Sequence, residues 1–86
     1  MRTYKIRWKK SAVKDMEIIP KLYITKIFEI IDLLSNNPFP EGCKKLVSLD
    51  KTYRIRIADY RIIYQIVNDV LVIEIIKIAH RKDAYK

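Results

Sequence analysis

The stretch TYRIRIADYRIIYQIVNDVLVIEIIKIAHRKDAY, residues 52–85, decides the fold of this chain. Residues 53–57 alternate apolar and basic side chains, which in a β-strand sends the apolar residues to one face and the arginines to the other. The alternation resumes after residues 58–59, so a two-residue turn there pairs Arg56 with Arg61. Like charges directly opposite each other repel by roughly 0.2–1 kcal/mol. Two facing guanidinium groups therefore indicate a site for an anion such as phosphate.

A second hairpin follows in the same stretch. A two-residue turn at Asn68 and Asp69 pairs Val67 with Val70, Ile63 with Glu74, and Arg61 with Ile76. This register assigns the residues of the sheet to two faces. The face expected to lie against helices carries Tyr53, Ile55, Ile57, Ile62, Tyr64, Ile66, Leu71, Ile73 and Ile75. The open face carries Arg54, Arg56, Arg61, Gln65 and Glu74, and His80 joins them if the last strand runs past Ile78.

The first half of the chain predicts the elements that cover this sheet. Residues 3–9 alternate as a first strand with one buried face. Ser11 is suited to cap a short helix that Pro20 interrupts. Between Lys21 and Leu34, an apolar stripe predicts a second, amphipathic helix, and the stripe consists of Ile24, Ile27, Phe28, Ile31 and Leu34. The fold class is therefore α+β: an N-terminal strand and two helices packed on an antiparallel sheet that a three-strand C-terminal meander completes.

Size and composition narrow the class of protein. The chain has 86 residues, half of them hydrophobic, which predicts a single domain over residues 1–86 with a modest core. Its net charge of +8 indicates a polyanionic partner, with nucleic acid favoured over an acidic protein, although many basic domains are merely solvated. The charge is spread along the chain and is not confined to a tail.

Few residues are suited to bind a metal or form a disulfide. Cys43 is the single cysteine and His80 the single histidine, so we expect no zinc site and a reducing, cytoplasmic compartment. The sequence contains no carboxylate cluster for a catalytic magnesium pair, and we expect no cofactor. The N-terminal residues are too charged for a signal peptide and no run is long enough to span a membrane, so we expect no membrane association.

Two polar residues near the arginines each have two interpretations. His80 is either a surface residue at a strand end or a proton-transfer group, since an unperturbed imidazole has a pKa of about 6.5. Glu74 either holds one of the arginines through a bidentate contact or forms an ordinary cross-strand charge pair, and the second is slightly favoured. Lys44 and Lys45 either contact an anion or are a solvated pair, and the second is favoured. Residues 35–42, which contain two prolines and the single glycine, Gly42, are interpreted as a connection between elements.

Taken together, these residues resemble a known family. The order of strand, two helices, YRIRI, ADYR, a tyrosine at position 64 and the closing HRKDAY resembles the RelE/ParE superfamily of toxins, and specifically its RelE branch. The resemblance covers nearly the whole chain. It implies a RelE-like fold and the toxin of a type II toxin-antitoxin system, a ribosome-dependent endoribonuclease that cleaves mRNA and inhibits translation. It also implies a cognate antitoxin as partner, with toxin and antitoxin forming a hetero-oligomer, and the ribosome with its mRNA as target.

The same resemblance implies roles for particular residues. Arg54 and Arg56 occupy two basic strand positions that bind substrate, where well-studied members carry lysine, and arginine cannot shuttle a proton at neutral pH. The catalytic set that the resemblance implies is Arg61, Arg81, Tyr85 and His80, with no metal. Among these, Arg61 is implied to hold the scissile phosphate. Tyr85 is implied to transfer a proton or to stack on a base, and the histidine has a counterpart in some branches only.

The chemistry consistent with both lines of reasoning is attack by an RNA 2′-hydroxyl on its adjacent phosphate, giving a cyclic phosphate and a free 5′-hydroxyl without metal. Two other functions stay open. A ParE-like toxin shares this fold and inhibits DNA gyrase by binding it, without nuclease activity. A basic RNA-binding module without chemistry is less favoured, because the sheet tyrosines mostly face the helices and provide no stacking platform.

Overall fold

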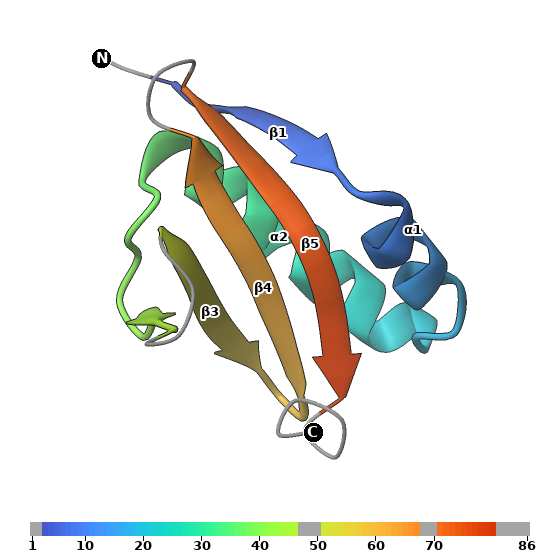
Figure 1. The fold of residues 1–86 in the computed structure, drawn as a ribbon. Helices are drawn as coiled ribbons and strands as arrows, with labels where there is room; N and C mark the ends of the chain where they lie inside the picture. The colour runs from blue at the N-terminus through green and yellow to red at the C-terminus, as the bar shows by residue number, and fades with distance from the viewer. Residues whose placement is uncertain (1–2, 47–50, 68–70, 81–86) are drawn as a thin grey trace.

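The computed structural model describes residues 3–46, 51–67 and 71–80. Within these residues the chain forms two helices and five strands. In order they are β1 (Lys5–Trp8), α1 (Lys10–Glu17), α2 (Lys21–Asn36), β2 (Lys44–Lys45), β3 (Thr52–Ile57), β4 (Tyr60–Val67) and β5 (Val72–His80). The strands form a sheet in the order β1-β5-β4-β3-β2, with α2 crossing behind it and α1 beside β5 (Figure 1). The α+β prediction is confirmed.

One strand pairing makes the sheet mixed where a wholly antiparallel sheet was expected. The meander β3–β4–β5 is antiparallel as predicted, but β1 runs parallel to β5, with Lys5 opposite Val72 and Trp8 opposite Ile75. A parallel pair requires a long connection, and here both helices and the rest of the sheet separate the two strands along the chain. Alternation in the sequence of β1 reveals its buried face but not the direction of its neighbour.

The core forms where the inner face of the sheet meets the helices. The prediction for that face is confirmed most clearly by six buried side chains, those of Ile55, Ile62, Tyr64, Ile66, Ile73 and Ile75. From α2, the predicted stripe buries Ile27, Ile31 and Leu34, whereas Phe28 stays about half exposed against Trp8. Tyr64 also donates a hydrogen bond of 2.8 Å from its hydroxyl to the carbonyl of Pro38. This bond ties the loop after α2 to the centre of the sheet.

The turn between β3 and β4 is the two-residue turn that the sequence predicts. Ile57 pairs with Tyr60 and Arg56 pairs with Arg61. Ala58 has a φ of +51°, a left-handed conformation that a two-residue hairpin turn demands and that glycine adopts more easily. The Nε of Arg56 donates a hydrogen bond of 3.1 Å to the Ala58 carbonyl, which helps to hold this conformation.

The predicted register between β4 and β5 is wrong. Val67 pairs with Val72 and not with Val70, so the connection is longer than two residues. Further along, Tyr64 pairs with Ile75 while Ile63 pairs with Lys77, which leaves Ile76 as an extra residue in β5. Such a β-bulge reverses the alternation of faces beyond it, because side chains in a strand alternate strictly.

Side chains of α1 hold this bulge in place. The hydroxyl of Ser11 donates to the carbonyl of Ile76 at 2.7 Å, and the carboxylate of Asp15 accepts from the backbone N–H of Ile78 at 3.0 Å. Ser11 is therefore not the helix cap that its position suggested; Lys9 occupies the cap position without a side-chain hydrogen bond. The pairing of β1 with β5 ends at Ile75, and beyond it these two side chains of α1 bond the Ile76 carbonyl and the Ile78 N–H. Buried backbone groups need such partners.

Candidate anion-binding site

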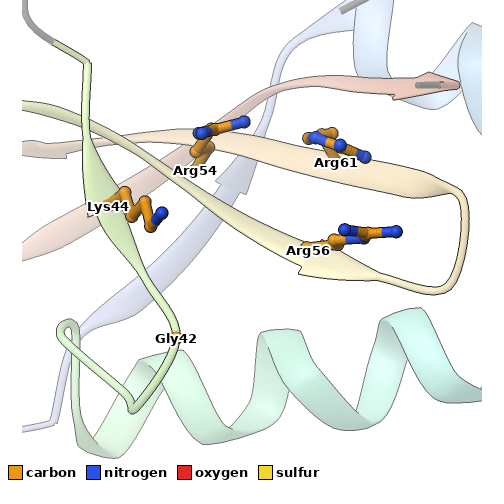
Figure 2. A pocket seen from close by; sticks show the side chains of 5 residues that line it. All are labelled: Gly42, Lys44, Arg54, Arg56 and Arg61. Atoms are coloured by element: carbon orange, nitrogen blue, oxygen red, sulfur yellow. The ribbon is translucent and has the colours of Figure 1, made fainter. Parts of the chain in front are cut away.

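Basic side chains from three strands line one pocket of about 290 Å³ on the open face of the sheet (Figure 2). The described residues that line it are Gly42, Lys44, Arg54, Arg56 and Arg61. None of these residues is acidic. The prediction that the three arginines share one face is confirmed.

Strand pairing places these cations in two cross-strand pairs. Arg56 lies opposite Arg61 in the β3–β4 ladder, and Lys44 lies opposite Arg54 in the β2–β3 ladder. Residues directly opposite in an antiparallel ladder point to the same face with their Cβ atoms about 4.5–5.5 Å apart. Two like-charged pairs on one face are unfavourable for folding alone. Their repulsion is relieved when an anion binds between them.

The arginines differ in how freely they move. Arg61 is 5 % exposed, and its Nε and Nη1 atoms are inaccessible to solvent, whereas Arg56 is exposed. Burial restricts the rotamers of a long side chain, so the guanidinium of Arg61 is held in position before any ligand arrives. Such preorganisation is what makes a cation effective at stabilising charge that develops in a reaction.

His80 does not lie on the face where the sequence placed it. Because of the bulge at Ile76, His80 pairs with Tyr60, and Ala79 takes the place opposite Arg61. The His80 ring lies edge-on to the ring of Tyr60, with centroids 5.3 Å apart. Tyr60 in turn contacts Tyr23 of α2, so this side of the sheet is the helix side.

A second pocket receives the histidine on that side. It has a volume of about 270 Å³, and its lining includes Asp15 and Ile18 of the α1 region together with Lys77 and His80 of β5. The expectation that His80 shares the arginine face is therefore wrong. Arg81 and Tyr85, the other two residues expected at the site, lie outside the described residues.

Glu74 forms its salt bridge with an arginine outside the pocket. Its carboxylate accepts from the Nε of Arg7 at 3.0 Å, a contact between β5 and β1. The second interpretation of Glu74, an ordinary cross-strand charge pair, is the one that this contact supports. The acid thus balances charge at the β1 edge of the sheet and not at the pocket.

Two residues of the pocket were not assigned to the site from the sequence. For Lys44 the solvated interpretation was favoured over contact with an anion, and Gly42 was interpreted as part of a connection. Lys44 reaches the pocket because β2 pairs with β3 in a register that sets it opposite Arg54. A two-residue edge strand carries too short a pattern to reveal this pairing, so only its basic character was a signal.

Two further properties bear on what the described part of the chain can bind. Neither of its helices has the length and apolar character that crossing a membrane requires. In the same residues, no group of three or more His, Cys, Asp or Glu side chains is placed to hold a metal ion.

The family can be assigned from known proteins that match this fold and sequence. A family model described as "ParE toxin of type II toxin-antitoxin system, parDE" matches residues 6–85. The chain belongs to this family. It is thus a toxin of a type II toxin-antitoxin system in the RelE/ParE superfamily, as its sequence motifs suggested.

Relatives that bear RelE names resemble the chain over most of its length. A protein of Methanocaldococcus jannaschii named "Putative toxin RelE1" is 36 % identical over 80 residues, covering 90 % of this chain and 89 % of the relative. The RelE–RelB complex of Pyrococcus horikoshii contains a chain with a TM-score of 0.83 and 32 % identity, over 95 % of this chain and 99 % of that one. The RelB–RelE antitoxin-toxin complex of Methanococcus jannaschii gives a TM-score of 0.77 and 28 % identity, over 92 % and 94 %. These matches confirm the RelE-like fold.

Proposed function

We propose that this toxin is a ribosome-dependent endoribonuclease that cleaves mRNA in the cytoplasm and so inhibits translation. The observation that supports the proposal best is the pocket in which Arg56 faces Arg61 with no acidic residue among its described lining. A guanidinium forms charge-assisted hydrogen bonds to phosphate oxygens, so facing arginines suit an RNA phosphate whose charge grows during reaction. The RelE names of the relatives support the same function.

The proposed reaction needs no redox step, and the bond that forms and the bond that breaks at phosphorus both lie within the RNA. The 2′-oxygen forms a bond to the adjacent phosphorus, and the bond from phosphorus to the 5′-oxygen of the next nucleotide breaks. The proton of the 2′-hydroxyl passes to a base, and an acid protonates the departing 5′-oxygen. A positioned acid or base contributes typically about 10²–10⁴-fold to such a step.

We assign the residues of this mechanism as follows. Arg61, preorganised by burial, binds the scissile phosphate in the transition state. Arg54 and Arg56 bind the substrate strand, with Arg56 at the scissile phosphate opposite Arg61. Arg81 and Tyr85 stabilise the leaving group and transfer the proton. His80 is a weaker candidate for the acid than the sequence suggested, because it lies on the helix side of the sheet next to Tyr60.

Mapping RNA ends on programmed ribosomes tests this proposal. Wild-type protein should produce 2′,3′-cyclic phosphate and 5′-hydroxyl ends. Arg61→Ala should lower single-turnover cleavage by on the order of 10²-fold or more and leave ribosome binding little changed, since many lysines elsewhere contribute to binding. Because Arg61 is buried, Arg61→Lys serves as the folded control that keeps charge and loses the forked geometry. Cleavage that leaves 3′-hydroxyl ends would falsify the 2′-hydroxyl mechanism.

The proton-transfer assignment has its own test. Tyr85→Phe keeps the ring and removes the hydroxyl, so it should abolish most cleavage if Tyr85 transfers a proton. If Tyr85→Phe cleaves normally and Tyr85→Ala does not, the ring acts by stacking. His80→Gln should then lose activity if the histidine is the acid despite its position.

An antitoxin partner is supported by the relatives, whose chains were solved in complexes of toxin with antitoxin. We propose that an acidic, partly disordered antitoxin segment folds over the basic pocket or displaces the C-terminal residues, giving a hetero-oligomer in which cleavage is silenced. Its affinity should weaken as salt increases. A basic antitoxin, or a complex that still cleaves RNA, contradicts this form of control.

A second candidate function is inhibition of DNA gyrase by binding, which the ParE description of the family model favours. A supercoiling assay separates the two functions. Inhibition of gyrase by the purified toxin, with no cleavage on programmed ribosomes, would replace the nuclease proposal.

A further inference from the structure

The cations of the pocket are arranged as two pairs at different positions along β3. The pair nearer the turn is Arg56 with Arg61, and the pair farther from it is Lys44 with Arg54. Figure 2 shows the same separation, with Arg56 and Arg61 toward the turn and Lys44 beside Arg54 away from it. Arg54 and Arg56 are two residues apart on one strand, which places their Cα atoms about 6.6 Å apart.

This spacing suits a ligand with more than one phosphate. Successive phosphates of an extended nucleic-acid backbone lie at a comparable separation, one nucleotide apart. The spacing between the two cation pairs therefore matches the spacing between two neighbouring phosphates. With one phosphate at each pair, both pairs are satisfied without all four side chains having to converge on one point.

We propose that Lys44 and Arg54 form a second phosphate subsite, which binds the phosphate next to the scissile one held by Arg56 and Arg61. The inference rests on the proposed function for the identity of the scissile phosphate, but the subsite itself binds RNA whether or not cleavage follows. Lys44 is then a substrate-binding residue. It comes from β2, the edge strand whose register with β3 places it at the pocket.

The loop that leads to Lys44 leaves room for the approach of an RNA backbone. Gly42 lines the pocket beside Lys44 and has a φ of +93°, a conformation that favours glycine. Apart from Gly42 and its two chain neighbours, no heavy atom of the described residues lies within 4 Å of the position a Cβ would take there, so the space next to this glycine is open. An RNA strand can therefore pass close to the backbone of the loop on its way to Lys44.

Lys45 provides a matched control for Lys44. Both are exposed lysines in the same two-residue strand, so replacing either changes the net charge equally. Lys45 pairs with Tyr53, whose ring stacks near that of Tyr64 on the core side, so it points away from the arginine face. Only Lys44 lines the pocket. A difference between the two variants thus reports position and not charge alone.

The test combines protein variants with neutralised ligands in double-mutant cycles. The ligand is a 2′-O-methyl trinucleotide, which cannot be cleaved, with either two phosphate linkages or a neutral methylphosphonate at one of them. Binding to the isolated toxin is measured by calorimetry at low ionic strength. Lys44→Ala should weaken binding of the fully charged ligand by about threefold to tenfold. Lys45→Ala should change it by less than about twofold.

The cycles then assign each cation to a linkage. One methylphosphonate should remove the effect of Lys44→Ala and the other should remove the effect of Arg56→Ala. If the same linkage removes both effects, or if wild-type protein binds all three ligands equally, there is one phosphate site and the proposal is overturned. Equal effects of Lys44→Ala and Lys45→Ala also overturn it, because they indicate general electrostatic attraction.

The outcome can be separated from that of the nuclease proposal. If ribosomal cleavage occurs as expected and the cycles fail, only the second subsite is lost. If the cycles succeed and wild-type protein cleaves no mRNA on ribosomes, the two-phosphate site stands and the nuclease assignment fails.

Discussion

Replacing Asp15 with alanine tests how α1 holds the bulge of β5, and with it the side of the sheet on which His80 lies. The Asp15 carboxylate accepts from the backbone N–H of Ile78 at 3.0 Å, and Ile78 is 4 % exposed. The same Asp15 carboxylate lies 3.8 Å from the Nζ of Lys77, whose side chain is 47 % exposed. Without Asp15, a buried backbone donor loses the acceptor that holds it.

The expected magnitude follows from these two contacts. A hydrogen bond to a charged acceptor contributes about 1.5–3 kcal/mol. The exposed ion pair with Lys77 is long and screened by solvent, so its contribution is at the low end of about 0–1 kcal/mol. Asp15→Ala should therefore lower the free energy of unfolding by about 2 kcal/mol, a large share of the 5–15 kcal/mol typical of a domain. Asp15→Asn keeps an acceptor oxygen and should cost about half as much.

Urea denaturation and amide hydrogen exchange measure these effects. The exchange of the Ile78 amide should accelerate more in Asp15→Ala than the exchange of amides in β3. Glu17→Ala, an exposed acid at the end of the same helix, is the matched control and should change stability by less than about 0.5 kcal/mol. If Asp15→Ala and Glu17→Ala have equal stability and equal Ile78 exchange, the carboxylate does not hold the bulge and this reasoning is wrong.

Three other changes test the turn, the core and the site. Ala58→Gly should raise the free energy of unfolding by about 0.5–1 kcal/mol in urea denaturation, because it relieves the left-handed alanine; a loss of stability contradicts this. Tyr64→Phe should cost about 1–2 kcal/mol by removing the hydrogen bond to Pro38. Burial raises the pKa of the Tyr64 phenol above its ordinary value of 10.0, so the folded state favours the protonated form. Wild-type stability should therefore fall as pH rises above about 10, and Tyr64→Phe should lack that part of the fall. Arg56→Ala should change the free energy of unfolding by less than about 0.5 kcal/mol while RNA binding weakens, because the repulsion from Arg61 and the bond to the Ala58 carbonyl offset each other. A loss of several kcal/mol in the free energy of unfolding would place this side chain in the core.

The sequence alone determined the features that depend on neighbouring residues. Alternation in residues 53–57 assigned the arginines and isoleucines of β3 to opposite faces, and the two-residue turn at Ala58 and Asp59 set Arg56 opposite Arg61. The apolar stripe of α2 likewise predicted that Ile27, Ile31 and Leu34 would be buried. Each of these follows from a local period, of two residues in a strand or of 3.6 in a helix, which the chain carries wherever it folds.

Only the tertiary structure decided the features that depend on distant residues. Nothing local to β5 shows that Ile76 is an extra residue, since the bulge is held by Ser11 and Asp15 from the other end of the chain. One inserted residue turned His80 from the arginine face to the helix side. The parallel pairing of β1 with β5 and the place of Lys44 opposite Arg54 depend in the same way on contacts between strands. Periodicity assigns a face within one strand, but the register between two strands is set by the side chains and hydrogen bonds that they and their neighbours share.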